Sequence, residues 1–510
     1  MNSLSIFNKN CVKIRLNHLR YYSKRRPELP KCDFNANNSK SRLGNFEIET
    51  IHKLNLNPCL KPWYQKPVLI TQGYMQYVWD NENKRYLDMF GGVATTSVGH
   101  CHPKLVEATT KQLKKLWHTS SIYYNEEIHE YASNLANRLP EPLNNIFFCN
   151  SGSEANDIAI LMARLYTKSY DIIALRNAYH GDSTSTQPLC GVQSWRFPLP
   201  LHFGIHHTTN PDPYSGRFGG SNCRDSIIQT TRQCDCEPGH CKAEDMYVED
   251  LEQLFDSTLP KNVCAFIAES IQGVGGVVQF PKNFLKRAFE MVRQRNGVCI
   301  VDEVQTGFGR TGTHFWGFEG HGVIPDIVTM AKSIGNGFPL AAVATTASIA
   351  KTLTEASYFN TFGGNPLASC VGLNVLKIID EENLQNNCHI IGSKLLTELE
   401  NLRNKYPDII GDVRGKGLMI GVELTSSAVS IQHKNIKERK PMIKADFDSI
   451  LEDCRDMGLL IGRGGPKGNV FRVKPPMCIN EEDITFTIDV LAKAFDLHNE
   501  RSAKRRNKYL

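Results

Sequence analysis

A carboxylate and an amine, each following an apolar stretch, are the first residues whose chemistry can be judged from the sequence. Asp302 ends the apolar run 298–301, and Lys332 follows a second apolar run thirty residues later. An unpaired buried carboxylate costs several kcal/mol, so Asp302 requires a partner. Burial lowers the pKa of a lysine and makes its amine a nucleophile towards an aldehyde. The pair is therefore a candidate carbonyl-reactive site, and a direct Asp302–Lys332 ion pair with a structural role is the alternative.

A glycine-containing turn offers a second part of a site. The sequence Ser-Gly-Ser-Glu-Ala at 151–155 lies between an apolar segment at 146–149 and a segment with helical character. Backbone N–H groups at the start of a helix bind anions, and glycine permits close approach. The same residues are equally compatible with a simple helix N-cap. The G-x-G-x-x-G pattern at 307–312 is rejected as a dinucleotide motif, because Arg310 crowds the turn and the acid-bearing strand end lies too far upstream.

The elements that must position these residues alternate between strands and helices. Strands are predicted at 146–149, 172–175, 265–268, 297–302 and 326–330. Continuous apolar strands that alternate with helices indicate an α/β fold with a mostly parallel sheet, whose active site lies at the carboxyl ends of the strands. A hairpin is predicted at 77–88, a helix from 103 to about 117 and an irregular arm at 27–60. Beyond 360, helices at 370–379 and 393–402, strands at 419–424 and 470–473, and a final helix from 481 indicate a smaller α+β lobe.

Length, composition and charge exclude several classes of function. The 510 residues predict two or more lobes, and no stretch approaches the ~18 apolar residues that a membrane helix needs. The net charge of +6 arises at the ends: residues 1–26 hold seven basic and no acidic residues, and residues 501–510 hold five basic ones, so the remainder carries −6. Nucleic-acid and membrane partners are therefore not expected. The basic, acid-free start predicts a mitochondrial presequence, residues 1–22, and a matrix location; a disordered basic tail is the alternative.

Four of the sixteen cysteines cluster in the sequence. Cys223, Cys234, Cys236 and Cys241 follow the spacing Cys-x10-Cys-x-Cys-x4-Cys, and His240 stands beside the last. These residues could bind zinc. The spacing does not match a usual zinc knuckle, and a matrix location would keep the thiols reduced. The sequence therefore favours a reduced surface loop without a metal.

Six motifs together resemble the class III aminotransferases, pyridoxal 5'-phosphate (PLP) enzymes of fold type I. They are SGSEA (151–155), AYHG (178–181), AESIQG (268–273), VDEVQTGFGRTG (301–312), MAKSIGNG (330–337) and FNTFGGNP (359–366). The resemblance covers roughly residues 50–495. It implies a large PLP-binding domain at 101–358 with a cysteine-bearing insertion near 204–245. A smaller α+β domain would combine an arm and N-terminal segment at 23–100 with residues 359–498, before a basic tail at 499–510.

The resemblance implies roles for the cofactor-binding residues. Lys332 would form the Schiff base with the PLP aldehyde and transfer the proton between substrate and cofactor carbons. Asp302 would keep the pyridine nitrogen protonated, where each pKa unit of support is worth ~1.4 kcal/mol. Asp302 and Lys332 would then face opposite ends of the cofactor instead of pairing with each other. Gln305 would bond the ring hydroxyl.

Further cofactor contacts are also implied by the resemblance. Gly152 and Ser153 would hold the phosphate, and Tyr179 would stack on the ring. Thr361 matches the family position that reaches the phosphate of the neighbouring subunit, which implies a homodimer or a homotetramer.

For substrates, the resemblance implies small amino acids and 2-oxo acids. Arg472 would bind the substrate carboxylate in bidentate fashion, with Glu269 also on the substrate side. Val274 stands where the ornithine- and GABA-using members carry a glutamate that masks this arginine, so the mask is absent here. Ser270 departs from the proline usual after Glu269.

The reaction that this pattern implies is transfer of the amino group of L-alanine to glyoxylate, giving pyruvate and glycine. Donors such as 3-aminoisobutyrate and dimethylarginines are also implied. Two alternatives remain open. A class III phospho-lyase acting on phosphoethanolamine or phosphohydroxylysine would share the fold, and an inactive scaffold with a metal-binding cysteine loop would share the cluster.

Overall fold

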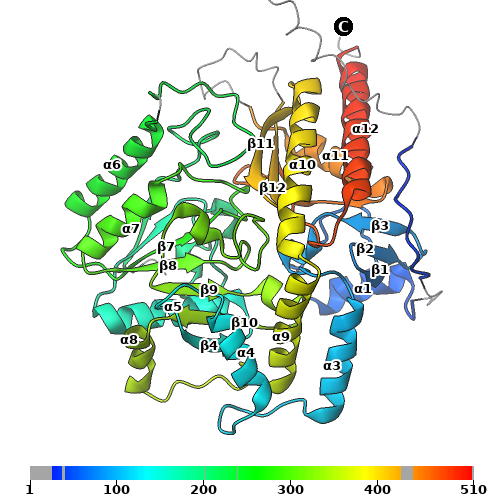
Figure 1. Ribbon diagram of the computed structural model, residues 1–510. Coiled ribbons are helices and arrows are strands. Elements are labelled where there is room, and N and C mark those ends of the chain that lie inside the picture. Colours follow the sequence, from blue (N-terminus) through cyan, green and yellow to red (C-terminus); the bar gives the residue numbers. More distant parts are fainter. Residues whose placement is uncertain (1–25, 37–40, 201–202, 238, 427–439, 508–510) are drawn as a thin grey trace, which may run out of the picture.

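A seven-stranded sheet lies at the centre of the computed structural model, which describes residues 26–36, 41–200, 203–237, 239–426 and 440–507 (Figure 1). Its strand order is β4-β10-β9-β8-β7-β5-β6. The strands are β4 (Asn145–Cys149), β5 (Ile172–Leu175), β6 (Ile205–Thr208), β7 (Ala265–Glu269), β8 (Val298–Asp302), β9 (Ile327–Met330) and β10 (Ala341–Thr345). Within this sheet β10 runs antiparallel to both neighbours, and the rest share one direction. The predicted mostly parallel sheet is confirmed.

Helices cover both faces of this sheet, which explains why its strands are apolar throughout. Val298 and Ile300 of β8 pack in one cluster with α5 (Gly152–Thr167), whereas Cys299 and Val301 face the cluster that contains α6 (Lys242–Ser257) and α7 (Phe284–Gln294). Successive strand residues point to opposite faces, so a sheet buried on both sides shows no polar alternation. Short helices near its edge are α8 (Ala347–Ala350) and the 3-10 turns η4 (Lys332–Gly335) and η5 (Lys351–Glu355).

Long helices join the sheet to the second lobe. They are α3 (Pro103–Lys115), α4 (Glu126–Ala136), α9 (Pro366–Glu381) and α10 (Leu384–Lys405). Shorter elements lie elsewhere: the helix α2 (Gly91–Ala94) and the 3-10 turns η1 (Gln187–Leu189), η2 (Gln193–Trp195) and η3 (Gly317–His321). In Figure 1, α9 and α10 rise from the sheet towards the second lobe. The predicted helices at 370–379 and 393–402 are confirmed, although α10 begins nine residues earlier than expected.

Both ends of the chain build the second lobe. One sheet has the order β1-β2-β3-β13, with β1 (Ile70–Tyr74), β2 (Tyr77–Asp80), β3 (Arg85–Asp88) and β13 (Leu459–Leu460). The other has the order β11-β12-β15-β14, with β11 (Ile410–Lys416), β12 (Met419–Leu424), β15 (Val470–Val473) and β14 (Gly462–Gly464). Helices α11 (Lys444–Asp456) and α12 (Glu481–Arg506) complete it. The predicted hairpin at 77–88 and the smaller α+β lobe are confirmed.

Three expectations about segments outside the three sheets need correction or lie beyond the structure. The arm at 27–60 contains a helix, α1 (Asn45–Asn55), in a stretch without glycine or proline. The basic tail is largely helical, because α12 continues to Arg506 and ion pairs from Arg501 to Asp453 and from Arg505 to Asp446 fasten it to α11. The predicted presequence, residues 1–22, lies outside the described residues. Among those described, no helix is both long and apolar enough to span a membrane.

The insertion near 204–245 contains β6, the start of α6 and an irregular connection between them. The connection, residues 209–241, is called the cysteine loop below; it holds neither helix nor extended strand in its described part. Cys223 is completely buried, while Cys234, Cys236 and Cys241 are half-buried. The expectation of a surface loop is therefore wrong for Cys223, whose neighbours fold the loop back onto the protein.

Candidate active site

The carboxyl ends of three neighbouring strands bring polar residues together. Glu269 of β7 lies in register with Asp302 of β8, which lies in register with Thr329 of β9, and Lys332 begins the turn after β9. These strand ends border a cavity of about 210 Å³. It is lined by Ser151, Gly152, Ser153, Asn156, Tyr179, His180, Gly181, Glu269, Asp302, Val304, Gln305 and Lys332. The crossover connection between the parallel strands β8 and β9 thus places Asp302 and Lys332 in one crevice.

Asp302 is buried and fully engaged by hydrogen bonds. Its Oδ2 lies 2.9 Å from His180 Nδ1 and accepts a 2.9 Å bond from the Asn156 amide, while its Oδ1 accepts from the backbone N–H of Val304 at 3.0 Å. Burial alone would raise the pKa of Asp302, but these bonds, with His180 foremost, hold the pKa below its ordinary value. The basic side chain that contacts this carboxylate is His180. The alternative of a structural Asp302–Lys332 pair is not found among the described residues.

Lys332 presents its amine to the cavity from an unusual backbone position. Its φ is +54°, in the left-handed region that non-glycine residues rarely occupy. Desolvation by the surrounding protein lowers the pKa of its amine to about 8, opposed by the attraction of Asp302 and assisted by the repulsion of Arg472. A lysine with this pKa has a substantial neutral fraction near physiological pH. Such an amine can attack a carbonyl carbon.

The start of α5 forms an anion-binding wall. The Ser151 side chain caps the helix by accepting from the Glu154 N–H at 3.2 Å, which leaves the N–H groups of Gly152 and Ser153 free of that cap. A Cβ on Gly181 would lie 2.5 Å from Ser153 Oγ, so only glycine allows the opposite loop to approach. The dipole of a sixteen-residue helix adds positive potential at this point. The wall is suited to a phosphate group.

Tyr179 closes one side of the cavity. Its ring lies edge-on to Trp195, with the centroids 5.0 Å apart, and its hydroxyl donates to Asp182 at 2.9 Å. Its backbone N–H donates to Glu269 at 3.3 Å, and burial raises the pKa of that carboxyl. Two neighbours therefore fix the ring before any ligand binds.

A cationic corner lies beside Gln305. The Gln305 Oε1 accepts from Arg472 at 3.1 Å and from the Lys474 amine at 2.7 Å, and both cations are buried. Burial lowers the pKa of Arg472 to about 10 and moves the pKa of Lys474 well below its ordinary value. A Cβ on Gly273 would collide with the Gln305 amide, which explains a glycine there. The Arg472 guanidinium, with the Lys474 amine beside it, forms a site that attracts an anion.

The two departures from the family pattern are accommodated locally. The Ser270 hydroxyl donates to buried Glu303, whose pKa burial raises to about 7, so serine gains a bond that proline could not make. Val274 places no carboxylate near Arg472; its carbonyl instead accepts from the Gly465 N–H at 3.0 Å.

Thr361 is the predicted site residue that the structure places apart from the others. It is exposed and does not line the cavity of its own chain. Three exposed aromatic residues flank Thr361 in the sequence: Tyr358, Phe359 and Phe362. The His118 ring packs on Phe362, with the ring centroids 5.6 Å apart.

Three residues escaped the sequence-based assignment. His180 and Asn156 support Asp302, and Lys474 shares Gln305 with Arg472. His180 lies within the AYHG segment, so its position next to Tyr179 was a usable signal. Lys474 follows Arg472 by two residues on an extended segment, and that spacing places both side chains on one face. Asn156 is one of many polar residues on a helix and carried no signal of its own.

The residues present fit PLP. The α5 N-terminus suits its phosphate, Asp302 suits a protonated pyridine nitrogen, and the Lys332 amine suits its aldehyde. The Nε2 of His180, which lines the cavity, is buried and has no hydrogen-bond partner among the described residues, so it could bond a polar group of a bound ligand.

Comparison with known proteins identifies the class. Residues 60–495 match the family described as aminotransferase class III, and the chain belongs to this family of PLP-dependent enzymes. It is therefore an aminotransferase acting on amino acids and 2-oxo acids.

Individual relatives narrow the comparison. The chain is 49% identical over 480 residues to alanine–glyoxylate aminotransferase 2, mitochondrial, of Homo sapiens, covering 94% of this chain and 91% of the relative. It is 43% identical to alanine–glyoxylate aminotransferase 2 homolog 2, mitochondrial, of Arabidopsis thaliana, covering 86% and 84%. A solved phospholyase from Arthrobacter in complex with phosphoethanolamine superposes with a TM-score of 0.76 at 29% identity, covering 88% and 98%.

Proposed function

We propose that this aminotransferase transfers the amino group of L-alanine to glyoxylate and forms pyruvate and glycine, with 3-aminoisobutyrate and dimethylarginines as further donors. The observation that carries the proposal is the cationic corner at Arg472, which no acidic side chain at position 274 masks. Alanine and glyoxylate each carry a carboxylate next to the reacting carbon. A permanently available arginine serves both half-reactions.

In the proposed mechanism, Lys332 is the residue that moves the proton. When bound, PLP supplies an electron sink for the electrons released at the substrate carbon. The Lys332 amine, with its lowered pKa, can take a proton at the substrate carbon and return it at the cofactor carbon. Asp302 would hold the proton on the pyridine nitrogen, and the bonds from His180 and Asn156 keep the Asp302 carboxylate ionised and oriented.

The remaining pocket residues bind and orient. Gly152 and Ser153 would donate to the phosphate, Tyr179 would cover the ring face and Gln305 would reach the ring hydroxyl. The α5 N-terminus, the fixed Tyr179 ring and the position of Gln305 at the cavity wall support these roles.

Arg472 binds the substrate carboxylate in the proposed mechanism, and the Lys474 amine adds a second hydrogen-bond donor. Both donate to the single oxygen of Gln305, and a carboxylate brings two charged oxygens that satisfy them better. The Phe90 ring, 5.3 Å from the Arg472 guanidinium, limits where the arginine can move. Glu269 sits on the substrate side and partly balances these cations.

A homodimer, or a homotetramer built from it, is part of the proposal. Thr361 would reach the phosphate site of the partner subunit, because it is exposed on its own chain. The exposed aromatic residues Tyr358, Phe359 and Phe362 beside it provide the apolar area that an interface needs. A mitochondrial matrix location is also proposed, supported by the acid-free basic segment 1–26 and by the names of the relatives.

A donor and acceptor assay tests the function. The purified PLP-loaded enzyme, given L-alanine and glyoxylate, is expected to form pyruvate and glycine in equal amounts. The phospho-lyase alternative, favoured by the solved phospholyase fold relative, predicts phosphate release from phosphoethanolamine and no pyruvate. Absence of both products, with no alanine-induced change in the visible absorbance, would support the scaffold alternative.

A further inference from the structure

Three cysteine sulfurs converge at the base of the cysteine loop. The Sγ atoms of Cys223, Cys236 and Cys241 all lie within 4.8 Å of one another. No disulfide links them, since all three are free thiols. We propose that they bind a structural Zn²⁺ ion, with Cys234 as the fourth ligand. This site is separate from the PLP pocket and plays no part in transamination.

The spacing of the sulfurs suits zinc. A tetrahedral site with Zn–S bonds of about 2.3 Å separates its sulfurs by roughly 3.8 Å. The three sulfurs need to move by less than a bond length to reach that arrangement. Thiolate ligands select soft or borderline cations such as Zn²⁺ over Mg²⁺ or Ca²⁺.

The start of α6 supplies a positive environment for thiolates. Cys241 is the residue before the first helical position, and the backbone N–H groups of Lys242 and Ala243 interact with the Cys236 sulfur. The N–H of Glu244 interacts with the Cys241 sulfur. The N–H groups of Lys242 and Ala243 belong to the first turn of α6, where a helix leaves its donors without partners inside the helix, and they face the Cys236 sulfur. A zinc ion and the helix end would therefore share the thiolate charge.

Cys234 lies beside the three converging sulfurs, but its own Sγ is not within 4.8 Å of all three. Its sulfur interacts with that of Cys236 and now donates to the Ser221 carbonyl at 2.8 Å, a contact that it would exchange for the metal. A Cβ on Gly220 would lie 2.4 Å from the Cys234 Cβ, so glycine there lets the two segments of the loop approach each other. His240 is less suitable, because its Nε2 is paired with Asp245 at 2.7 Å and its side chain is exposed.

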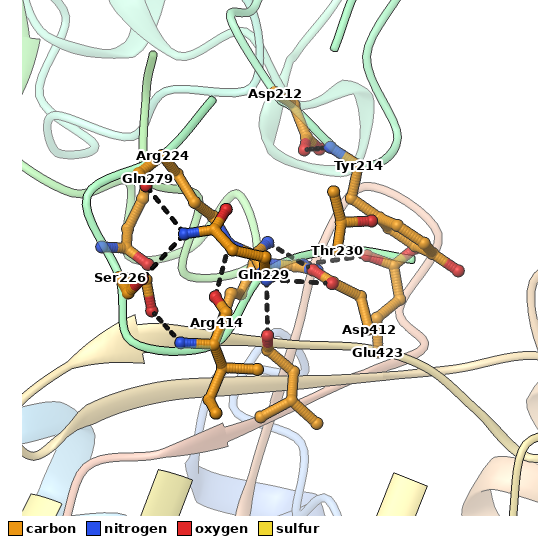
Figure 2. A network of polar contacts seen from close by, with 12 residues as sticks. Asp212, Tyr214, Arg224, Ser226, Gln229, Thr230, Gln279, Asp412, Arg414 and Glu423 are labelled. Atoms are coloured by element: carbon orange, nitrogen blue, oxygen red, sulfur yellow. Dashed lines mark hydrogen bonds and ion pairs between the residues drawn. The ribbon is translucent and has the colours of Figure 1, made fainter. Parts of the chain in front are cut away.

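The residue after Cys223 shows what the metal would hold in place. Arg224 is buried and donates to both Asp412 oxygens, at 2.8 and 3.1 Å, and to the Val413 carbonyl at 2.6 Å (Figure 2). Asp412 also accepts from Arg414 at 3.0 Å, and Arg414 pairs with Glu423. The cysteine loop is thereby fastened to β11 and β12 of the second lobe.

This network continues towards the substrate side of the pocket. Arg414 donates twice to the Gly276 carbonyl, at 2.9 and 2.7 Å, two residues beyond Val274. A closed four-thiolate site stabilises a fold and leaves no open position for catalysis. The zinc would fix the loop that lacks regular secondary structure, and the loop would fix Arg224 between the lobes.

Elemental analysis of the full-length, PLP-loaded enzyme from zinc-supplemented cells tests the proposal. We expect about one zinc per chain, and a thiolate-to-metal absorption band after exchange for Co²⁺. Cys236→Ser, at a half-buried position, should reduce the zinc content at least about tenfold, since losing a thiolate ligand weakens the site. Cys101→Ser, an exposed cysteine outside the cluster, should retain it. Alanine–glyoxylate activity per PLP-loaded chain should change less than about threefold in Cys236→Ser.

Three results would overturn the proposal. They are metal-free enzyme in which all four thiols react rapidly with a thiol reagent under native conditions, a disulfide between any two of them in peptide mapping, and stoichiometric iron in place of zinc. Because buried Cys223 could be needed for folding, Cys234→Ser provides a second variant. Zinc content unchanged in both Cys234→Ser and Cys236→Ser would exclude the assigned ligands.

Discussion

The PLP pocket and the cysteine loop are both clusters of reactive side chains, but different forces position them. In the pocket, Asp302 and Lys332 sit at the ends of paired strands, and backbone hydrogen bonds fix them before any ligand binds. In the loop, no helix or extended strand among the described residues separates Cys223 from Cys236. The loop cysteines depend on one another and on the proposed ion. Loss of a pocket residue should therefore affect chemistry, whereas loss of a loop contact should affect stability.

Replacing Lys332 by Ala should produce the largest effect. We expect kcat for pyruvate formation to fall by at least about 10⁴-fold, because both the covalent attachment and the proton transfer are lost. Borohydride reduction of the wild-type holoenzyme should label position 332. The thermal stability without PLP should remain near that of the wild type. Lys351→Ala, which changes an exposed lysine on η5, is the matched control and should keep full activity. A label elsewhere would contradict the assignment.

The rate of PLP uptake by the apoenzyme should depend on pH through Lys332. Only the neutral amine attacks the aldehyde, and the neutral fraction rises as pH increases through the pKa of about 8. The uptake rate should rise to a plateau above that pH. At pH 7, lowering the pKa from 10.5 to about 8 increases the neutral fraction roughly 300-fold. Stopped-flow absorbance would measure this, and a rate still rising steeply above pH 9 would mean that the amine is not desolvated.

Asp302→Asn should reduce kcat by about 10²-fold. The amide keeps the shape but cannot hold a proton on the pyridine nitrogen, and a shift of about two pKa units is worth this factor. The His180 contact should survive in altered form. Asp326→Asn changes an acid that precedes β9 and pairs with Arg293 outside the pocket, so kcat should stay within about twofold. Equal losses in both variants would indicate a folding defect instead.

Arg224→Met should lower the stability of the protein with little effect on its activity, the opposite of the pocket variants. Asp412 keeps Arg414 as a partner, so the loss of unfolding free energy should be about 2 kcal/mol, less than for an isolated buried pair. The kcat of the folded enzyme should change by less than about threefold. Thermal unfolding and steady-state kinetics on the same preparations would measure both. A loss of activity without a loss of stability would mean that the loop contributes to the reaction.

The same contrast explains what could be predicted from the sequence. Strand ends in a parallel sheet meet at one edge, so the spacing of Asp302 and Lys332 was sufficient to place them in one crevice. Segment 419–424 was placed correctly because its apolar run matches β12. No comparable rule predicts from the sequence which residues of the cysteine loop meet. The sulfurs of Cys223 and Cys241 meet because of Arg224 and the start of α6, contacts that the spacing of cysteines does not encode.

The sequence also did not predict the residues that support other pocket residues. Lys474 contacts Gln305 only where the two lobes meet, and Asn156 contacts Asp302 through the packing of α5 on β8. Neither residue stands in a strand-end motif with a chemical signature. The helix α1 was missed for another reason. Its Ile48, Ile51 and Leu54 recur at a helical spacing of three, but this short signal stands in the polar stretch 27–60, and none of the three is buried.

At position 332, the left-handed backbone conformation lowers the stability of the protein, whereas the lysine side chain provides the reactive amine. A non-glycine residue in this conformation costs about 1–2 kcal/mol, and glycine or asparagine would occupy it more comfortably. Replacement by glycine would thus remove the reactive amine while relaxing the chain. Selection for stability alone would therefore favour another residue at position 332. Selection for the activity keeps the lysine in place.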